Sequence, residues 1–129
     1  MQILREHLSG QGNGLAGWLK ALADPRIAPA LKLMHGEPAK AWGLEELAKA
    51  SAKSRTTFAA LFKQVAGVAP VTYLTEWRMR LAEYQLREDS TSVAEISRSL
   101  GYASESAFSN AFKRQTGKRP TTYRSEHVP

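Results

Sequence analysis

Basic side chains gather in two stretches of this sequence that contain no acidic residue. Residues 49–63 carry four lysines and arginines, and residues 113–124 carry five. Clustered positive charge attracts nucleic acid, because each neutralised phosphate releases condensed counterions. The whole chain has the same sign, with 18 Lys and Arg against 12 Asp and Glu and a formal net charge of +6. A polyanion is therefore the first partner class to consider.

Other chemistries find little support in the residue types. The chain has no cysteine, which excludes disulfides, zinc fingers and thiol catalysis. Its three histidines, His7, His35 and His127, lack the spacing of a metal-binding pair. Residues 12–17, GNGLAG, match a dinucleotide-binding pattern, but no strand precedes them and no βαβ unit follows. We therefore expect no enzyme, no metal, no cofactor and, without a long apolar run, no membrane span.

The elements that would position the basic residues are all helical. Apolar residues recur at spacings of three and four, and strand-like alternation never extends beyond a few residues. Capping serines and terminal glycines mark the expected helix ends, namely Ser54, Ser92, Ser104, Gly67 and Gly117. Because 129 residues suit one domain, we predict a single all-α domain.

Apolar stripes predict which face of each helix is buried. A first core helix should follow Asp24-Pro25, with Ile27, Ala30, Leu31 and Met34 inward. The expected inward residues of a connecting helix over about 71–87 are Leu74, Trp77, Leu81 and Tyr84. Those of the helices that begin after Ser54 and Ser104 are Phe58, Leu61, Phe62 and Val65, then Phe108, Ala111 and Phe112. After Pro120 we expect one last turn.

The chain contains an internal repeat with an offset of fifty residues. Eight identities fall within twenty positions, from Ser54 paired with Ser104 to Tyr73 paired with Tyr123. Upstream the offset is forty-nine, so the second copy holds one extra residue between its paired helices. Each copy has the pattern of a helix, a tight turn and a capped helix, which is a helix-turn-helix. A duplicated hairpin that only builds a bundle is the structural alternative.

The spacing of the two copies suits duplex DNA. We place the first helix-turn-helix at about 43–66 and the second at about 92–116, within a domain over residues 18–129 that follows a tail or linker over 1–17. A connecting helix of about sixteen residues spans about 24 Å. Adding the half-widths of packed helices separates the second helices of the two copies by roughly 30–35 Å, close to the ~34 Å between successive major grooves.

The second helix of each copy, the expected recognition helix, has outward residues that could read bases. Arg55 could hold guanine, Asn110 adenine, and Glu105 could accept from cytosine N4. Each could instead be a solvated residue or a phosphate contact, and Glu105 could simply stabilise the helix N-terminus. The predicted base-reading residues are Arg55, Thr56, Thr57, Ala59, Ala60, Glu105, Ser106, Ser109 and Asn110. The predicted phosphate contacts are Lys53, Lys63, Lys113, Arg114, Lys118 and Arg119. Arg78 is expected to form a structural ion pair with Glu46.

The segment SVAEISRSLGYASESAFSNAFKRQTGKRPTTYR, residues 92–124, resembles the signature of the AraC/XylS transcription regulators nearly end to end. The resemblance covers about residues 18–125. It implies two helix-turn-helix subdomains that bind double-stranded DNA in adjacent major grooves, transcription regulation, and RNA polymerase as a further partner. Because the first residues do not have the continuous apolar segment of a secretory signal, we expect the cytoplasm as the location. The resemblance also implies a C-terminal module, monomeric alone, in a regulator that can dimerise, with residues 1–17 left from a cupin-like sensor. The alternative function is a basic module that docks an acidic protein.

The sequence departs from the family pattern at four positions. Ala52 stands in the first turn where the family usually has glycine, and Lys53 stands where it usually has an apolar residue. Ala60 and Asn110 occupy positions where members often have arginine. The resemblance therefore implies a strained or rearranged first turn and fewer or different base contacts.

Overall fold

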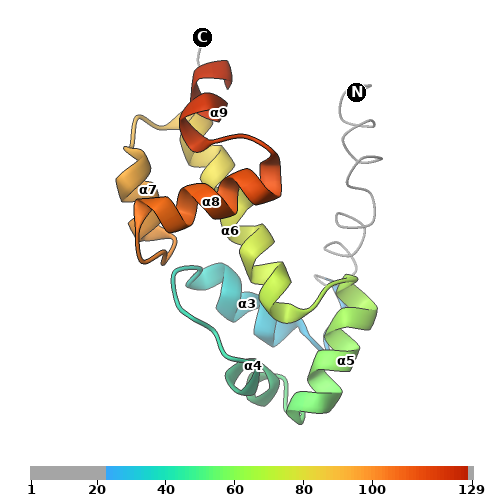
Figure 1. Ribbon diagram of the computed structural model, residues 1–129. Coiled ribbons are helices and arrows are strands. Elements are labelled where there is room, and N and C mark those ends of the chain that lie inside the picture. The colour runs from blue at the N-terminus through green and yellow to red at the C-terminus, as the bar shows by residue number, and fades with distance from the viewer. Residues whose placement is uncertain (1–22, 128–129) are drawn as a thin grey trace. The chain divides into compact units, whose positions relative to one another are not determined.

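The computed structural model describes residues 23–127, which form seven α-helices and no strand, as the sequence predicts (Figure 1). The helices are α3 Ala28–Gly36, α4 Leu44–Ala50, α5 Arg55–Ala66, α6 Pro70–Glu88, α7 Val93–Ser99, α8 Glu105–Thr116 and α9 Pro120–His127. No helix in this range has the length and apolar character needed to cross a bilayer. The tail predicted over 1–17, with the GNGLAG match and His7, lies outside the described residues.

The helices belong to two compact units. Unit 1 contains α3, α4, α5 and the first residues of α6, up to Tyr73. Unit 2 contains the rest of α6 with α7, α8 and α9, and it also includes the segment Glu37–Ala41. Figure 1 shows α7, α8 and α9 gathered around the later part of α6. Each unit is thus one helix followed by a helix-turn-helix and then by helical residues that begin at a proline, Pro70 or Pro120.

The repeated unit in the structure is longer than the one predicted from the sequence, because it includes a leading helix. This helix is α3 before α4 and α5, and α6 before α7 and α8. At an offset of fifty-two, the buried residues of the two leading helices correspond, namely Ile27 with Met79, Ala30 with Ala82 and Met34 with Leu86. This offset differs from the one that aligns the later helices. The change of offset and the small number of identities hide this part of the repeat in the sequence.

Three aromatic rings form the centre of unit 1. Phe58 and Phe62, one turn apart on α5, have ring centroids 5.6 Å apart, and Phe62 meets Tyr73 edge-on at 5.5 Å. All three are fully buried. The Tyr73 hydroxyl lies 2.8 Å from Nε2 of His35 on α3, so its polar end has a partner inside the unit. These contacts hold α5 against α3 and the start of α6.

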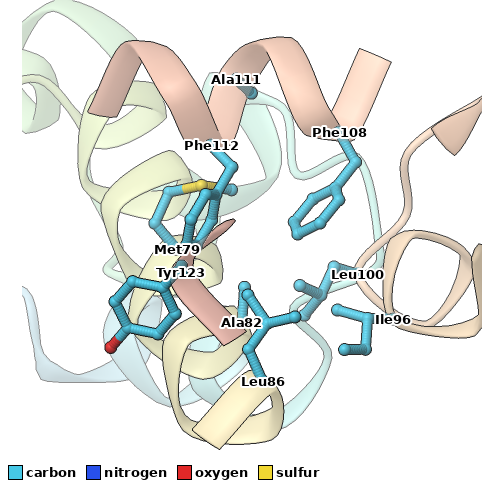
Figure 2. Packing of buried hydrophobic residues seen from close by; sticks show 9 residues of the cluster. All are labelled: Met79, Ala82, Leu86, Ile96, Leu100, Phe108, Ala111, Phe112 and Tyr123. Atoms are coloured by element: carbon cyan, nitrogen blue, oxygen red, sulfur yellow. The ribbon is translucent and has the colours of Figure 1, made fainter. Parts of the chain in front are cut away.

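Unit 2 repeats this arrangement (Figure 2). Phe108 and Phe112 on α8 have centroids 5.8 Å apart, and Phe112 meets Tyr123 edge-on at 5.4 Å. The Tyr123 hydroxyl accepts a hydrogen bond from Arg87 at 2.8 Å, where unit 1 uses a histidine. The buried residues of this core are Met79, Ala82, Leu86, Ile96, Leu100, Phe108, Ala111, Phe112 and Tyr123. Figure 2 shows Phe108 pointing toward Ile96 of α7 and toward Leu100, the residue that follows α7, which fixes α8 against α7.

The apolar stripe predicted for the connecting helix is wrong in part. Leu74 is buried, but Trp77 and Leu81 are only half-buried and Tyr84 is 52% exposed. The residues of α6 at the centre of unit 2 are Met79, Ala82 and Leu86. A single stripe is not needed, because the first turn of α6 packs in one unit and its later turns pack in the other.

Most predicted helix ends are confirmed. The hydroxyls of Ser54, Ser92 and Ser104 accept from amides three residues later at 3.2, 3.1 and 3.0 Å. The helix expected after Asp24-Pro25 begins only at Ala28, because residues 25–27 form a turn, and the last turn expected after Pro120 is the eight-residue helix α9. On α5, Leu61 and Val65 are half-buried rather than buried.

The turn inside each helix-turn-helix has the same backbone in both units. Ala52 has a φ of 56° and Gly101 a φ of 86°, and the amide after each donates to a carbonyl of the preceding helix at 2.9 and 3.0 Å. Within residues 23–127, Ala52 is the only non-glycine residue with positive φ. A Cβ in this left-handed conformation costs about 1–2 kcal/mol. The strain expected in the first turn is therefore confirmed.

Replacing this strained residue should stabilise the protein. In Ala52→Gly, relief of the left-handed strain outweighs the greater freedom of glycine in the unfolded chain, so we expect the free energy of unfolding to rise by about 0.5–1 kcal/mol. Gly101→Ala is the matched control in the other turn. It should destabilise, because a Cβ there would lie 2.2 Å from the carbonyl oxygen of Ala39. Urea unfolding followed by circular dichroism measures both, and a less stable Ala52→Gly would contradict the assignment of strain.

The stability of unit 1 should depend on pH through His35. Burial lowers the pKa of His35 below its ordinary value of 6.5, so the unfolded chain takes up this proton first as the pH falls. The stabilisation is complete above about pH 6.5 and decreases as the pH falls from there toward the lowered pKa. In His35→Gln, which keeps a hydrogen-bonding group near Tyr73, the decrease between about pH 7 and pH 5 should be smaller. Equal slopes in urea titrations of both proteins would refute this origin.

Candidate nucleic-acid interface

The outward face of α5 begins directly after its serine cap. The first turn holds Arg55, Thr56 and Thr57, all exposed, and it contains no acid. One turn later, Ala60 is exposed and Ala59 is half-buried. Because Phe58 and Phe62 occupy the opposite face, the five predicted base-reading residues of α5 lie together on one end of one helix.

The equivalent face of α8 has different chemistry. Glu105 and Ser106 are exposed in its first turn, Asn110 is exposed one turn later, and Ser109 is half-buried. Ala107, whose amide donates to the Ser104 cap, is exposed as well. The carboxylate of Glu105 lies where the helix N-terminus stabilises negative charge. The two faces therefore share their geometry and differ in charge, one cationic and one acidic.

The predicted phosphate contacts lie mostly at the other end of these helices. Lys63 is in the last turn of α5, and Lys113 and Arg114 are in the last turn of α8. Lys118 and Arg119 occupy the connection between α8 and α9. All five side chains belong to exposed residues. Each unit thus combines a polar first turn with basic residues at or beyond the opposite helix end.

Lys53 lies instead beside the first turn of α5. A hollow of about 540 Å³ opens where α4 meets the N-terminus of α5. It is lined by Glu45, Ala48, Lys49, Ala52, Lys53, Ser54 and Arg55. The structure therefore brings Lys53 next to Arg55, which joins a predicted phosphate contact to a predicted base contact. Lys49 completes this basic group but was absent from the predicted phosphate contacts, although it begins the acid-free stretch 49–63.

Two of the basic residues near α8 are held within unit 2. The Lys118 ammonium forms an ion pair with the carboxylate of Glu126 on α9. The Arg124 guanidinium donates to the carbonyl oxygens of Leu86 and Asp89, each at 3.2 Å, and to that of Thr91 at 2.5 Å. Arg124 is thus an anchor between α9 and the end of α6, although its place in a basic stretch gave no sign of this role. Among residues 23–127, no group of acids and histidines is placed to hold a metal ion.

The comparison with known families decides the classification. The family described as "Helix-turn-helix domain" matches residues 47–126, from α4 to α9 and through both units. A protein of Streptomyces antibioticus named as an AraC-like transcription regulator is 48% identical over 129 residues, which cover 100% of this chain and 43% of that protein. This chain belongs to the AraC family of helix-turn-helix proteins. The resemblance seen in the sequence is confirmed.

Solved structures of AraC-type proteins share the fold. One is the DNA-binding domain of AdpA, a global transcriptional factor, in complex with a target DNA; it is 30% identical, with a TM-score of 0.73 over 80% of this chain and 92% of that chain. Another, an AraC-type regulator from Chromobacterium violaceum, is 26% identical, with a TM-score of 0.74 over 80% of this chain and 92% of that chain. Our AraC-type chain spans less than half the length of the curated relatives it matches.

Proposed function

We propose that this AraC-type chain binds double-stranded DNA in a sequence-specific manner and thereby regulates transcription. One observation carries the proposal: α5 and α8 each bury two phenylalanines and expose a polar first turn, with basic residues at the opposite helix end. Helix-turn-helix proteins place such a helix in the major groove, with its N-terminal residues at base edges. Basic side chains outside the groove contact phosphates. The likeness to the AdpA domain, whose structure contains a target DNA, supports this inference.

Two recognition helices suit two adjacent major grooves. Both have twelve residues, both start after a capping serine, and both end before a left-handed glycine. Their first turns nevertheless differ, since α5 carries Arg55 and α8 carries Glu105. Arginine pairs with guanine, whereas a carboxylate accepts from cytosine N4 and Asn110 suits adenine. We therefore infer two unlike half-sites rather than a direct repeat of one sequence.

We also propose a location, partners and a domain organisation for the longer protein. We infer that it acts in the cytoplasm without catalysis of its own, that RNA polymerase is a second partner, and that a dimer is the form of the longer protein. Residues 18–129 would be its DNA-binding domain, with residues 1–17 as a link to a sensor domain. These inferences rest on the AraC-type classification, which is one of transcription regulators.

A gel-shift series with a random duplex tests the basic function. Neutralised phosphates release counterions, so log affinity should fall linearly with log salt concentration, with a slope of about −0.9 for each phosphate contact. A control series uses an acidic polypeptide in place of DNA. Affinity for the polypeptide with none for the duplex would overturn DNA binding and establish the protein-docking alternative.

Base contacts and phosphate contacts should respond differently to substitution. Arg55→Ala should weaken binding to a selected site by about 1–3 kcal/mol and relax the preference at one base pair. Lys113→Ala should weaken binding to all sequences alike and reduce the salt slope by about one. Titrations of both variants on a selected and a scrambled duplex measure this. An equal loss on both duplexes for Arg55→Ala would refute its role in base reading.

The ion pair between α9 and Lys118 should compete with DNA. Glu126→Gln releases the Lys118 ammonium, so we expect tighter binding to every duplex and a salt slope steeper by about one. Glu95→Gln removes the same charge from an exposed residue of α7 and controls for net charge. The gain should disappear when Lys118→Gln is added to Glu126→Gln. A gain that persists in this double variant would show that Lys118 is not the group released.

A further inference from the structure

Residues 37–41 occupy an unusual place in the fold. In sequence they join α3 and α4, both helices of unit 1, but they pack as part of unit 2. The chain therefore leaves unit 1 after Gly36, lies on unit 2, and returns at Trp42. With the passage after Tyr73 inside α6, the polypeptide crosses between the units three times.

Arg78 holds this segment at two points. Its Nε donates to the carbonyl oxygen of Pro38 at 2.6 Å, and its Nη2 donates to that of Lys40 at 3.0 Å. Two bonds from one planar guanidinium fix the direction of the segment as well as its position, and the charge strengthens each bond. The ion pair with Glu46 predicted for Arg78 is therefore wrong, because its guanidinium donates to these two backbone carbonyls instead.

The middle of the segment covers the turn between α7 and α8. A Cβ added to Gly101 would lie 2.2 Å from the carbonyl oxygen of Ala39, so only glycine allows this approach. The Arg78 guanidinium also lies 5.6 Å from the ring centroid of Tyr102. Tyr102 meets Phe108 of α8 edge-on at 5.6 Å. A continuous set of contacts therefore runs from the segment to the recognition helix of unit 2.

The matching turn of unit 1 has different residues at the corresponding positions. Ala52 and Lys53 stand there, forty-nine residues before Gly101 and Tyr102. An alanine at the left-handed position is strained but possible, since no close backbone contact of the kind made by Gly101 is required of it. The contact with residues 37–41 therefore explains why glycine is needed in one turn and dispensable in the other.

We propose that residues 37–41 form a tether that couples the two units, and that Arg78 is the residue that positions it. This inference rests on the proposed function. Linked binding modules gain affinity from each other only as far as the linkage holds both at their sites. When Arg78 no longer holds the tether, residues 37–41 become a slack loop and the α7–α8 turn loses a support. Arg78 then determines how strictly the chain requires its two half-sites in register.

The test compares two arginine variants on two duplexes. Arg78→Met removes both donors and keeps a side chain of similar length. Arg87→Met is the matched control, because Arg87 lies on the same helix and donates to Tyr123 in the core of unit 2. The first duplex is selected from a random library with the wild-type chain and footprinted. The second carries five extra base pairs between the two protected stretches, which rotates one by about half a helical turn.

The quantity compared is the affinity for the original duplex divided by the affinity for the duplex with the insertion. We expect the insertion to weaken wild-type and Arg87→Met binding about tenfold or more. Arg78→Met should bind the original duplex about tenfold more weakly and lose less than about threefold on insertion. If the insertion weakens Arg78→Met binding as much as it weakens wild-type binding, the tether is refuted while DNA binding stands. A wild-type chain that binds without regard to spacing would overturn both the tether and two-groove binding, and one that binds no duplex would overturn the proposed function.

Hydrogen exchange examines the tether without DNA. The Lys40 amide donates to the carbonyl oxygen of Glu37 at 3.2 Å within the segment. If Arg78 holds the segment in place, this amide should exchange about tenfold faster in Arg78→Met and at the wild-type rate in Arg87→Met, because local opening sets the exchange rate. The Phe112 amide in α8 reports whether unit 2 remains folded. Unchanged exchange at Lys40 with a folded unit 2 would overturn the positioning role of Arg78.

Discussion

The burial of two phenylalanines one turn apart, on α5 and again on α8, is the constraint on which the rest of the structure depends. Phe58, Phe62, Phe108 and Phe112 are fully buried, and each such ring contributes about 1.5–3 kcal/mol of transfer free energy. A tyrosine from the following helix closes each pair edge-on. Once one face of a twelve-residue helix is committed to this core, the opposite face must be outward. Exposure of the predicted base-reading residues in the first turns is therefore a consequence of core packing.

Most of the secondary structure could be predicted because its signals are local. Serine caps, left-handed glycines and the phenylalanine spacing each act within a few residues, and all appear where the sequence places them. The face of α6 could not be predicted, since a helix that packs in two units has no single apolar stripe. The anchoring of Arg124 and the position of residues 37–41 depend on carbonyl groups more than thirty residues away. Every residue type has a backbone carbonyl, so the sequence does not show which carbonyls will accept these hydrogen bonds.

The two units share one architecture, but the residues at the turn are less favourable for stability in unit 1 than in unit 2. At the turn, unit 2 has Leu100, which is 3% exposed within its core, and Gly101. The corresponding residues of unit 1 are Ser51, whose buried hydroxyl has no hydrogen-bond partner within the described part of the chain, and the strained Ala52. An unsatisfied buried hydroxyl costs about 1–3 kcal/mol, and the left-handed alanine adds to this. Unit 1 is therefore the one expected to open first in local unfolding.

In unit 2 the proposed phosphate contacts lie apart from the proposed base contacts, and under the proposed function this separation would allow a chain of net charge +6 to discriminate between sequences. Phosphate contacts strengthen binding to every duplex alike, so they raise affinity without adding selectivity. In α8 the first turn carries the carboxylate of Glu105, which the phosphates of a bound duplex would repel and which a base donor such as cytosine N4 would stabilise. Lys113 and Arg114 in the last turn of the helix would offset that repulsion. Under the proposed function, we therefore expect the selectivity of unit 2 to come from the need of this carboxylate for a base donor.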